Sequence, residues 1–376
     1  PLGVDSFFDE QLERGAFHLV GGPGHVRRRL LGADPARTVL DAHATHATKL
    51  SWHAAAPAGR APEVAPADGP KAFLASIEQF HALGYTVRFA EVGALAPALA
   101  RFMRALEFLL HQPVKASLFW SAAGARAPVH YDDNDNVVIQ LTGRKRWLIS
   151  AEPPSLHNAW RDVAEGTPAL IEPQAVDLDE GDLLYVPRGT PHTVISETES
   201  LHLAIVFTPV TLREVIIAAL DHLSDDDRAL REKAIGRHDA GVDMVALSAR
   251  VGAVLDGLQA AARSPEFLTT ALQRRSSRVI GGLERLVGAS PPPLTPYSRV
   301  RHSPLAMCHM LATPGMIDFC QPGEHINVHR GVEPALRFIS VTPSFRVADL
   351  PGEMADEVRV ALVGRLVTSG FLEVLG

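Results

Sequence analysis

Two histidines and one aspartate in this chain have the side-chain types and the spacing of a metal site. His130 and Asp132 stand two residues apart. On an extended strand, residues i and i+2 project to the same side, so this imidazole and this carboxylate can hold one ion together. A lone His-x-Asp is a weak signal in a chain with 17 histidines, and its alternative is a surface or capping pair.

A second motif, GDLLYVPRGTPH, ends at His192. An apolar strand runs into a Pro/Gly turn, and the histidine begins the return strand, which delivers one rigid side chain to a barrel mouth. Two histidines and one carboxylate cover one face of an iron ion and leave positions open for O2 and a chelating co-substrate. Because no cysteine lies nearby to favour zinc or copper(I), the expected metal is Fe(II). His130, Asp132 and His192 are thus the expected ligands and the expected catalytic residues.

Lys145 follows the turn in QLTGRKRW. The strand that it begins alternates apolar side chains, so a lysine facing inward would need an anion. The far carboxylate of 2-oxoglutarate would supply that anion. The alternative is a solvated lysine in the turn.

From residue 114 to residue 207 the pattern is one of short strands separated by turns. The predicted strands are Lys115–Trp120, Asn136–Leu141, Arg146–Ser150, Asp182–Pro187, Thr193–Ser196 and Leu201–Thr208. Leu141–Arg144 reads as a hairpin turn. Many short antiparallel strands without intervening helices favour a sandwich or a barrel, the architecture to which cupins belong.

Helical spacing of apolar residues flanks this region on both sides. The predicted helices are Ser6–Leu31, Lys71–Gln79, Leu95–Leu110, Leu212–Leu223, Asp226–Ile235, Val242–Leu258, Phe267–Leu283 and Glu357–Phe371, with one further strand at Tyr85–Phe89. Residues 54–70 and 288–298 are rich in proline and read as a loop and a linker. We expect an α+β protein with a catalytic barrel and its N-terminal helices at 1–210, a helical segment at 211–287 and a small domain at 288–376.

The bulk composition excludes several classes of protein. The chain of 376 residues is 46% hydrophobic and 21% charged, which excludes disorder, and no signal peptide or 18-residue apolar run is evident. The net charge of −7 is opposite to that of a general nucleic-acid binder. We therefore expect no nucleic-acid partner and no membrane. Two cysteines, Cys308 and Cys320, cannot make a disulfide framework, which points to free thiols in a reducing cytoplasm.

Together these motifs resemble the JmjC-type 2-oxoglutarate oxygenases of the cupin superfamily, in their ribosomal-oxygenase branch. The matching text is HYDD at 130–133, QLTGRKRW at 140–147, GDLLYVPRGTPH at 181–192 and SLHL at 200–203. The resemblance implies a double-stranded β-helix barrel in which His130, Asp132 and His192 bind Fe(II). It also implies that Lys145 holds 2-oxoglutarate, and that His202 lies in the cofactor site.

The chain departs from the family pattern at two places. On the strand before the His-x-Asp, relatives often carry an asparagine that helps to bind co-substrate, and Ser117 stands here. After Asp132, Asn134 and Asn136 stand near a position where relatives place apolar or aromatic residues. If the strand phase continues, both face the iron and could touch substrate; a polar turn is the alternative. Tyr131 and Arg188, within the two motifs, complete the candidate substrate-binding residues.

The resemblance further implies a helical dimerisation segment, hence a homodimer, and a C-terminal winged-helix-like domain. Its activity would be hydroxylation of a protein or peptide side chain, such as Arg or His of a ribosomal protein, with release of succinate and CO2. Two alternatives stay open: the same chemistry on a free amino acid or natural-product peptide, and a metal-binding cupin scaffold without turnover. A histone demethylase is disfavoured because no reader modules or zinc-binding cysteines accompany the barrel.

Overall fold

The computed structural model describes residues 3–46, 52–55, 69–151, 156, 169–234, 243–281, 293–304, 306–312, 315–322 and 324–375. The chain divides into two compact units. The first comprises residues 1–106 and 114–208, and the second residues 107–113 and 209–376. The break after residue 208 lies near the domain boundary expected at 210, whereas the boundary expected at 287 falls outside the described residues.

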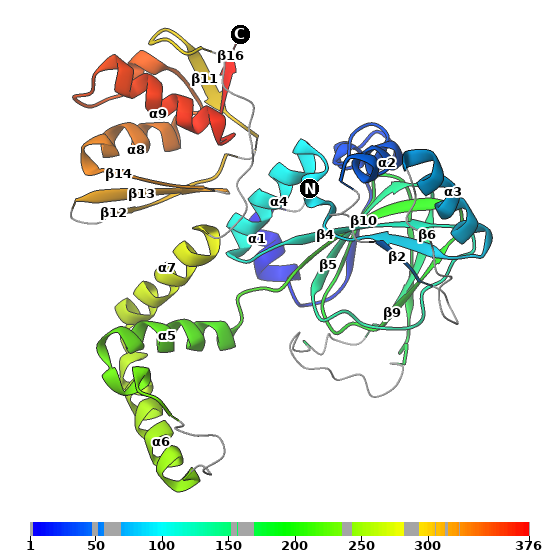
Figure 1. Ribbon diagram of the computed structural model, residues 1–376, viewed down its shortest axis with the longest axis horizontal. Helices are drawn as coiled ribbons and strands as arrows, with labels where there is room; N and C mark the ends of the chain where they lie inside the picture. The colour runs from blue at the N-terminus through cyan, green and yellow to red at the C-terminus, as the bar shows by residue number, and fades with distance from the viewer. Residues whose placement is uncertain are drawn as a thin grey trace. The chain divides into compact units, whose positions relative to one another are not determined.

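Two antiparallel sheets build the first unit (Figure 1). The larger has the order β1 (Phe17–Leu19), β8 (Leu183–Val186), β5 (Asp135–Thr142), β10 (Ser200–Phe207), β4 (Lys115–Ser121), β3 (Thr86–Phe89) and β2 (Trp52–Ala55). The smaller has the order β7 (Gln174–Leu178), β6 (Lys145–Ile149) and β9 (His192–Ser196). Every predicted barrel strand is present within one or two residues, and β7 is an additional strand that the sequence reading missed.

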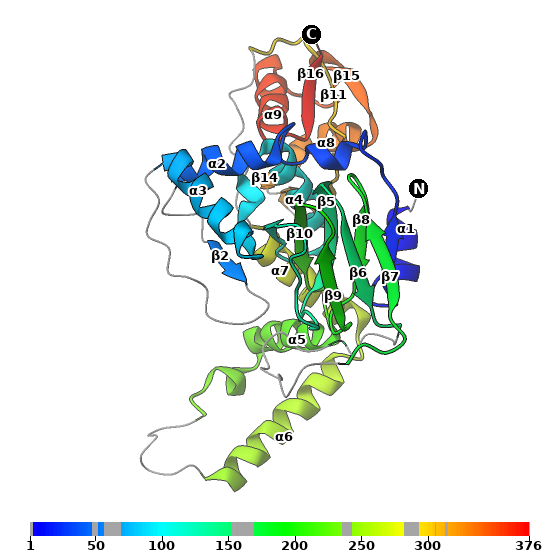
Figure 2. The same cartoon turned by 90° about the vertical axis from the view of Figure 1, so that its right-hand side faces the viewer.

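Figure 2 shows strands of the larger sheet beside those of the smaller one. Apolar side chains from both sheets form one buried cluster. They are Val138, Trp147, Ile149, Leu178, Leu184 and Val186. On β6 the buried and more exposed positions alternate, as the two-residue period of a strand requires. This is the barrel expected for a cupin, and the mixture of sheets and helices is the expected α+β class.

The expected hairpin at Leu141–Arg144 is wrong. The strands on its two sides do not pair: β5 belongs to the larger sheet and β6 to the smaller one. The turn instead carries the chain from one sheet to the other. Gly143 has a φ of 69°, and a Cβ there would meet the carbonyl oxygen of Glu199 at 2.2 Å, so only glycine fits.

The expected helix over Ser6–Leu31 is also wrong. The segment contains α1 (Val4–Ser6), a π-helical turn (Phe7–Gln11), strand β1 and a 3-10 turn (Val26–Arg29). The aromatic residues Phe7 and Phe17 pack on Tyr185 of β8, with ring centroids 5.5 Å and 5.2 Å away. Pairing with β8 therefore overrides the helical spacing of the local sequence.

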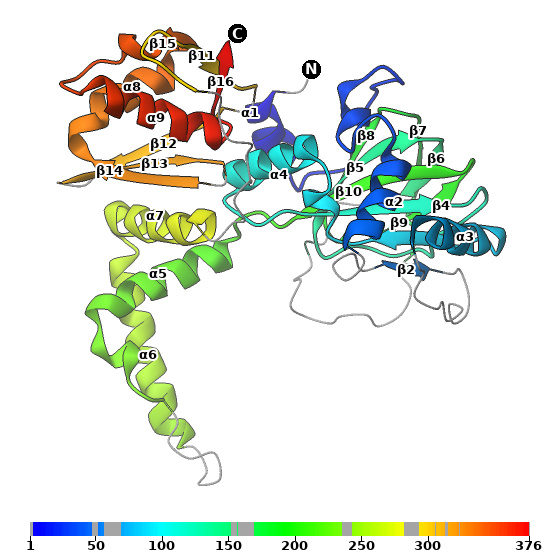
Figure 3. The same ribbon diagram turned by 45° about the horizontal axis from the view of Figure 1, so that its top comes forward.

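Figure 3 shows two helices beside the barrel, α2 (Pro35–His46) and α3 (Gly69–Ala82). Helix α2 was not predicted from the sequence, whereas α3 and α4 (Pro97–Leu110) confirm the predicted helices. A 3-10 turn (Val92–Ala94) precedes α4. The predicted strand at Tyr85–Phe89 is β3. Of the predicted loop at 54–70, residues 54–55 end β2, residues 69–70 begin α3, and residues 56–68 lie outside the described part.

The second unit begins with α5 (Leu212–Asp226), whose first turn is closed by a capping box between Thr211 and Glu214. A 3-10 turn (Arg228–Arg231), α6 (Met244–Ala261) and α7 (Pro265–Gly281) follow. The helix expected at Asp226–Ile235 is reduced to that single turn over its described residues. By length and composition alone α6, with a mean hydropathy of 1.2, could span a membrane. Of its side chains, only Leu258 is buried in the structure.

The C-terminal part of this unit contains two three-stranded sheets. One has the order β15 (Ser344–Arg346), β11 (Arg299–His302), β16 (Leu372–Leu375), and the other β12 (His309–Ala312), β13 (Met316–Gln321), β14 (Glu324–His329). Helices α8 (Glu333–Val341) and α9 (Asp356–Thr368), with 3-10 turns at Arg330–Val332 and Val347–Asp349, complete it. Phe319, Leu336, Val363 and their neighbours form its apolar core. Within the predicted linker 288–298, residues 293–298 carry no helix or strand.

Candidate metal centre

His130 and His192 face each other across a two-residue β-bridge. The backbone N–H of each donates to the carbonyl of the other, with N···O distances of 3.0 Å and 2.7 Å. This pair of hydrogen bonds fixes the register of the two residues, and their imidazole centroids lie only 4.4 Å apart. Residues far apart in sequence are thereby joined by the backbone itself.

Both imidazoles present the same ring nitrogen for binding. His130 Nδ1 lies 2.8 Å from the carbonyl oxygen of Pro128, and His192 Nδ1 lies 3.0 Å from that of Thr190. A carbonyl oxygen can only accept, so each Nδ1 carries the proton. Each Nε2 therefore keeps a free lone pair, the tautomer that a metal requires.

Asp132 completes a cluster whose ligand atoms all lie within 4.8 Å of one another. Its Oδ2 is 3.8 Å from His192 Nε2 and accepts a hydrogen bond from Asn136 Nδ2 at 3.3 Å. Two imidazoles and one carboxylate at this spacing suit an octahedral divalent ion held on one face. Burial, helped by His130, lowers the pKa of His192 and keeps this ring neutral.

Lys145 is buried in the same barrel. Its Nζ donates a hydrogen bond to Ser121 Oγ at 2.8 Å, and within the described ranges no carboxylate forms an ion pair with it. Burial lowers the pKa of Lys145 to about 7. The solvated-turn alternative is therefore wrong, and the barrel holds a cation without a protein anion.

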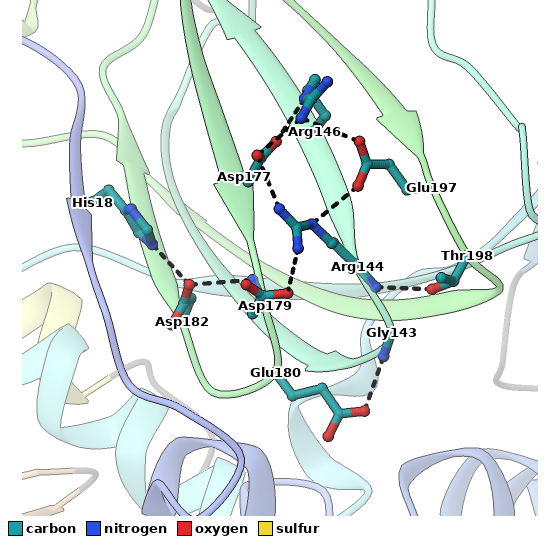
Figure 4. A network of polar contacts seen from close by, with 10 residues as sticks. All are labelled: His18, Gly143, Arg144, Arg146, Asp177, Asp179, Glu180, Asp182, Glu197 and Thr198. Carbon is teal, nitrogen blue, oxygen red and sulfur yellow. Dashed lines mark hydrogen bonds and ion pairs between the residues drawn. The ribbon is translucent and has the colours of Figure 1, made fainter.

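Unlike Lys145, the neighbouring arginines form ion pairs with carboxylates of the protein (Figure 4). Arg144 and Arg146 both pair with Asp177 and Glu197 at N···O distances of 2.6–3.4 Å, on the outer side of β6. These exposed ion pairs hold β6 to β7 and to the turn after β9. The alternation along the strand leaves Lys145 on the inner face, together with the apolar Trp147 and Ile149.

His202 and Ser117 lie on the strands beside Lys145. His202 is 5% exposed, stacks on Phe119 at 4.7 Å, and has its pKa lowered by burial and by Lys145; its Nδ1 has no hydrogen-bond partner in the described structure. Ser117 Oγ accepts from Arg88 at 3.1 Å. The hydroxyl that reaches Lys145 thus comes from Ser121, and co-substrate binding by Ser117 stays a prediction.

The candidate substrate-binding residues have different surroundings in the structure. Asn136 contacts Asp132, whereas Asn134 Oδ1 accepts from Thr208 Oγ1 at 2.9 Å. Tyr131 is partly exposed between the two ligands. Arg188 is 6% exposed and donates to Glu13 at 3.1 Å, with Asp135 at 3.7 Å.

Three residues near this centre were not singled out from the sequence. Ser121 bonds Lys145, Phe119 stacks on His202, and the Trp147 ring lies 5.4 Å from that of His192. Ser117, Phe119 and Ser121 alternate on β4 and so share the inner face. That alternation was a signal in the sequence, but only the pairing of β4 with β10 shows what it faces.

Two facing sheets form a barrel that brings two histidines and an aspartate together, which is the architecture of metal-binding cupins. Residues 94–215 match the JmjC domain family, in agreement with the resemblance drawn from the motifs.

Known proteins of the ribosomal-oxygenase branch are similar to this chain. The bifunctional lysine-specific demethylase and histidyl-hydroxylase NO66 of Drosophila simulans is 33% identical over 134 residues, 34% of this chain and 16% of that protein. Ribosomal oxygenase 2 of Rattus norvegicus is 32% identical over 148 residues, 37% of this chain and 30% of that protein. The chain thus spans less than a third of the length of these curated relatives.

The fold is similar over the whole chain to a solved structure. The structure of YcfD, a ribosomal oxygenase from Escherichia coli, in complex with cobalt and 2-oxoglutarate, superposes with a TM-score of 0.52 at 16% identity. The match covers 100% of this chain and 99% of that one. The two chains therefore share their overall fold.

Proposed function

We propose that the first unit is an Fe(II)- and 2-oxoglutarate-dependent oxygenase that hydroxylates a protein or peptide side chain. The observation that carries the proposal is the pairing of an open-faced metal site with a buried, unneutralised cation in one barrel. A scaffold that only binds metal needs neither the open face nor Lys145. The metal site fits iron, and the buried Lys145 fits the far carboxylate of 2-oxoglutarate.

His130, Asp132 and His192 would hold the iron, because all three offer unprotonated ligand atoms toward one point. Asn136 orients the Asp132 carboxylate, and the carbonyls of Pro128 and Thr190 orient the rings. Lys145 and Ser121 would hold the far carboxylate of 2-oxoglutarate, an anion that offsets the cost of burying the ammonium.

When bound, iron and 2-oxoglutarate together supply the oxidation of a C–H bond by O2, with release of succinate and CO2. The protein positions these groups and excludes water from them. Trp147 and Phe119 contribute to that exclusion, because their rings stack against His192 and His202. No nicotinamide or flavin is required, since the two electrons come from the co-substrate.

The substrate class is taken from the relatives. Their names include ribosomal oxygenase and histidyl-hydroxylase, and on this basis we assign an Arg or His side chain of a ribosomal protein. We also propose that the protein acts in the cytoplasm, where a ribosomal target would be present. Asp135 stands near the proposed ligands in the sequence, but it is fully buried and accepts a hydrogen bond from Tyr185. Its carboxylate therefore does not attract a basic target.

Aerobic incubation with Fe(II) and carboxyl-labelled 2-oxoglutarate tests the chemistry. Wild type should release labelled CO2, faster with a ribosomal-protein extract, and His130→Ala should abolish the release. His25→Ala is a control, because that ring bonds Arg27 and is no metal ligand. Wild-type protein that releases no CO2 with any protein, peptide or amino-acid mixture would establish the scaffold alternative.

Mass spectrometry of ribosomal proteins from wild-type and deletion strains tests the substrate. We expect a gain of one oxygen on one residue in the wild type only. CO2 release without any such oxygen would point to the free amino acid or natural-product peptide. Loss of methyl groups from lysine would instead point to the demethylase activity named for the NO66 relative.

We further propose that the chain is a homodimer through α5 and α6. Large apolar side chains are exposed on both helices, namely Leu212, Ile216, Ile217, Met244, Val245, Val251 and Leu255. Figure 3 shows α6 extending away from the C-terminal sheets of its unit. Apolar surface of this extent on one pair of helices is typical of an interface.

A further inference from the structure

A second group of metal-ligand side chains lies on one face of the sheet β12–β13–β14. His309 stands directly opposite Cys320, and Cys320 directly opposite His325. Residues that are directly paired across antiparallel strands project to the same face. Asp318 lies two residues before Cys320 on β13 and therefore shares that face.

Three of these side chains meet at their polar atoms. The distance from Asp318 Oδ2 to His325 Nδ1 is 2.9 Å, and that from Cys320 Sγ to the same nitrogen is 3.4 Å. The three ligand atoms all lie within 4.8 Å of one another. Ligands of one tetrahedral zinc ion stand about 3.3–3.6 Å apart, given bonds of about 2.0–2.3 Å.

The packing of these groups is costly for a purely structural cluster. Cys320 is fully buried, and Asp318 Oδ1 and His325 Nε2 are buried atoms without a hydrogen-bond partner in the described part of the chain. An unsatisfied buried polar atom destabilises the folded chain. A cation bound by Asp318 Oδ2, His325 Nδ1 and Cys320 Sγ would offset the charge of the Asp318 carboxylate, and it would use the three atoms that already converge.

We propose that Asp318, Cys320 and His325 bind one Zn²⁺ ion in the second unit. A thiolate combined with an imidazole selects zinc over the hard cations magnesium and calcium. The presence of a sulfur ligand also separates this site from the barrel site, whose three ligands are nitrogen and oxygen. The ion ties β13 to β14 and does not depend on the proposed oxygenase activity.

Of the three proposed ligands, Asp318 lines a cavity of about 750 Å³ together with residues of α5 and α7, among them His222 and Arg274. His309 does not take the fourth coordination position, because its ring is stacked on Phe108 with centroids 5.1 Å apart. Water from the cavity is the fourth ligand, as in zinc sites with three protein ligands.

Zinc binding displaces the proton of the Cys320 thiol and replaces the hydrogen bond between Asp318 and His325 by two bonds to the metal. One proton leaves to solvent for each ion bound at a protonated thiol. The affinity for zinc therefore rises with pH until the thiol is ionised without the metal.

Cobalt(II) titration of the full chain in a His130→Ala, Asp132→Ala background tests the site, because cobalt bound to a thiolate gives an ultraviolet charge-transfer band. We expect one equivalent with that band, displaced by Zn²⁺. Cys320→Ser should abolish the band and Cys308→Ser should retain it. Absence of the band in the parent, or its loss with Cys308→Ser and not Cys320→Ser, would overturn the assignment.

Two further variants guard against a folding artefact, because Cys320 is buried. Asp318→Asn and His325→Gln change partly exposed side chains and should each weaken cobalt binding at least 10-fold. Circular dichroism should show the same helix content for these variants as for the parent. Zn²⁺ should raise the Tm of the parent and leave that of His325→Gln unchanged; an equal rise in both would contradict the proposed ligands.

Discussion

Lys145 Nζ donates a hydrogen bond to Ser121 Oγ across 2.8 Å inside the barrel, while the next residue on the strand, Arg146, points outward to Asp177. Two consecutive residues of β6 thus differ in environment, because Lys145 is buried and Arg146 is exposed to solvent. The inner lysine is available for an anion that enters the barrel. The outer arginine is already neutralised by the protein.

Replacing Lys145 with Met should lower the affinity for 2-oxoglutarate about 100-fold, since losing one member of a buried charge pair costs about 2–5 kcal/mol. Iron affinity should change little, because Lys145 is no metal ligand. Calorimetric titration of 2-oxoglutarate in the presence of Mn²⁺ measures the co-substrate affinity, and titration of Mn²⁺ as a substitute for Fe(II) measures the metal affinity. Arg146→Met is the matched control and should bind 2-oxoglutarate as wild type does; an equal loss in both variants would refute the role of Lys145.

The stability of the protein without co-substrate should depend on pH through Lys145. Burial lowers the pKa of this group to about 7 from 10.5, so above pH 7 the unfolded chain binds more protons than the folded one. The free energy of unfolding therefore gains a contribution that grows as the pH rises from about 7 toward 10.5. Urea unfolding at pH 7 and pH 9 should show a smaller gain in Lys145→Met than in wild type. Parallel changes in the two proteins would contradict the prediction.

Asn136 should act as a positioning residue for the metal. Its Nδ2 donates to Asp132 Oδ2 at 3.3 Å, and partners of this kind change metal affinity about 10–100-fold. We expect Asn136→Ala to weaken Co²⁺ binding in that range without unfolding the barrel. Asn134→Ala, which loses only a contact to Thr208, should bind cobalt normally. Equal effects of the two substitutions would exclude this role.

The turn at Gly143 should be far more sensitive to substitution than another left-handed glycine of the same unit. Gly143→Ala combines a φ of 69° with a Cβ placed 2.2 Å from the Glu199 carbonyl, whereas Gly124→Ala has a φ of 81° and nothing within 4 Å. We expect losses of more than ~3 kcal/mol and of about 1 kcal/mol respectively. Urea unfolding of both variants measures the difference, and similar losses would show that the turn relaxes.

Dimer formation should depend on α6. Leu255 is 54% exposed in the single chain, and Leu255→Glu places a charge at this position. We expect this substitution to convert the dimer to a monomer in sedimentation experiments. Val341→Glu is the control, because Val341 is 77% exposed in the same unit but lies on α8. A wild-type chain that sediments as a monomer would overturn the proposed interface.

The sequence by itself determined which three side chains converge, namely His130, Asp132 and His192, and where most strands of the barrel run. Two-residue spacing places His130 and Asp132 on one side of the chain wherever the backbone is extended, and a Pro/Gly turn before His192 sets the start of a return strand. These features depend on local geometry, so no knowledge of distant contacts is needed. The strands of the barrel followed for the same reason.

Tertiary structure alone decided the features that depend on pairing between distant segments. Helical spacing in the N-terminal segment was overruled by the pairing of β1 with β8, and the turn at Gly143 joins two sheets because β5 and β6 have other partners. The burial of Lys145 and its bond to Ser121 depend on the closure of the barrel. Likewise, Cys320 and His325 meet Asp318 only through the register of β13 with β14, since strand register arises from packing across the whole sheet.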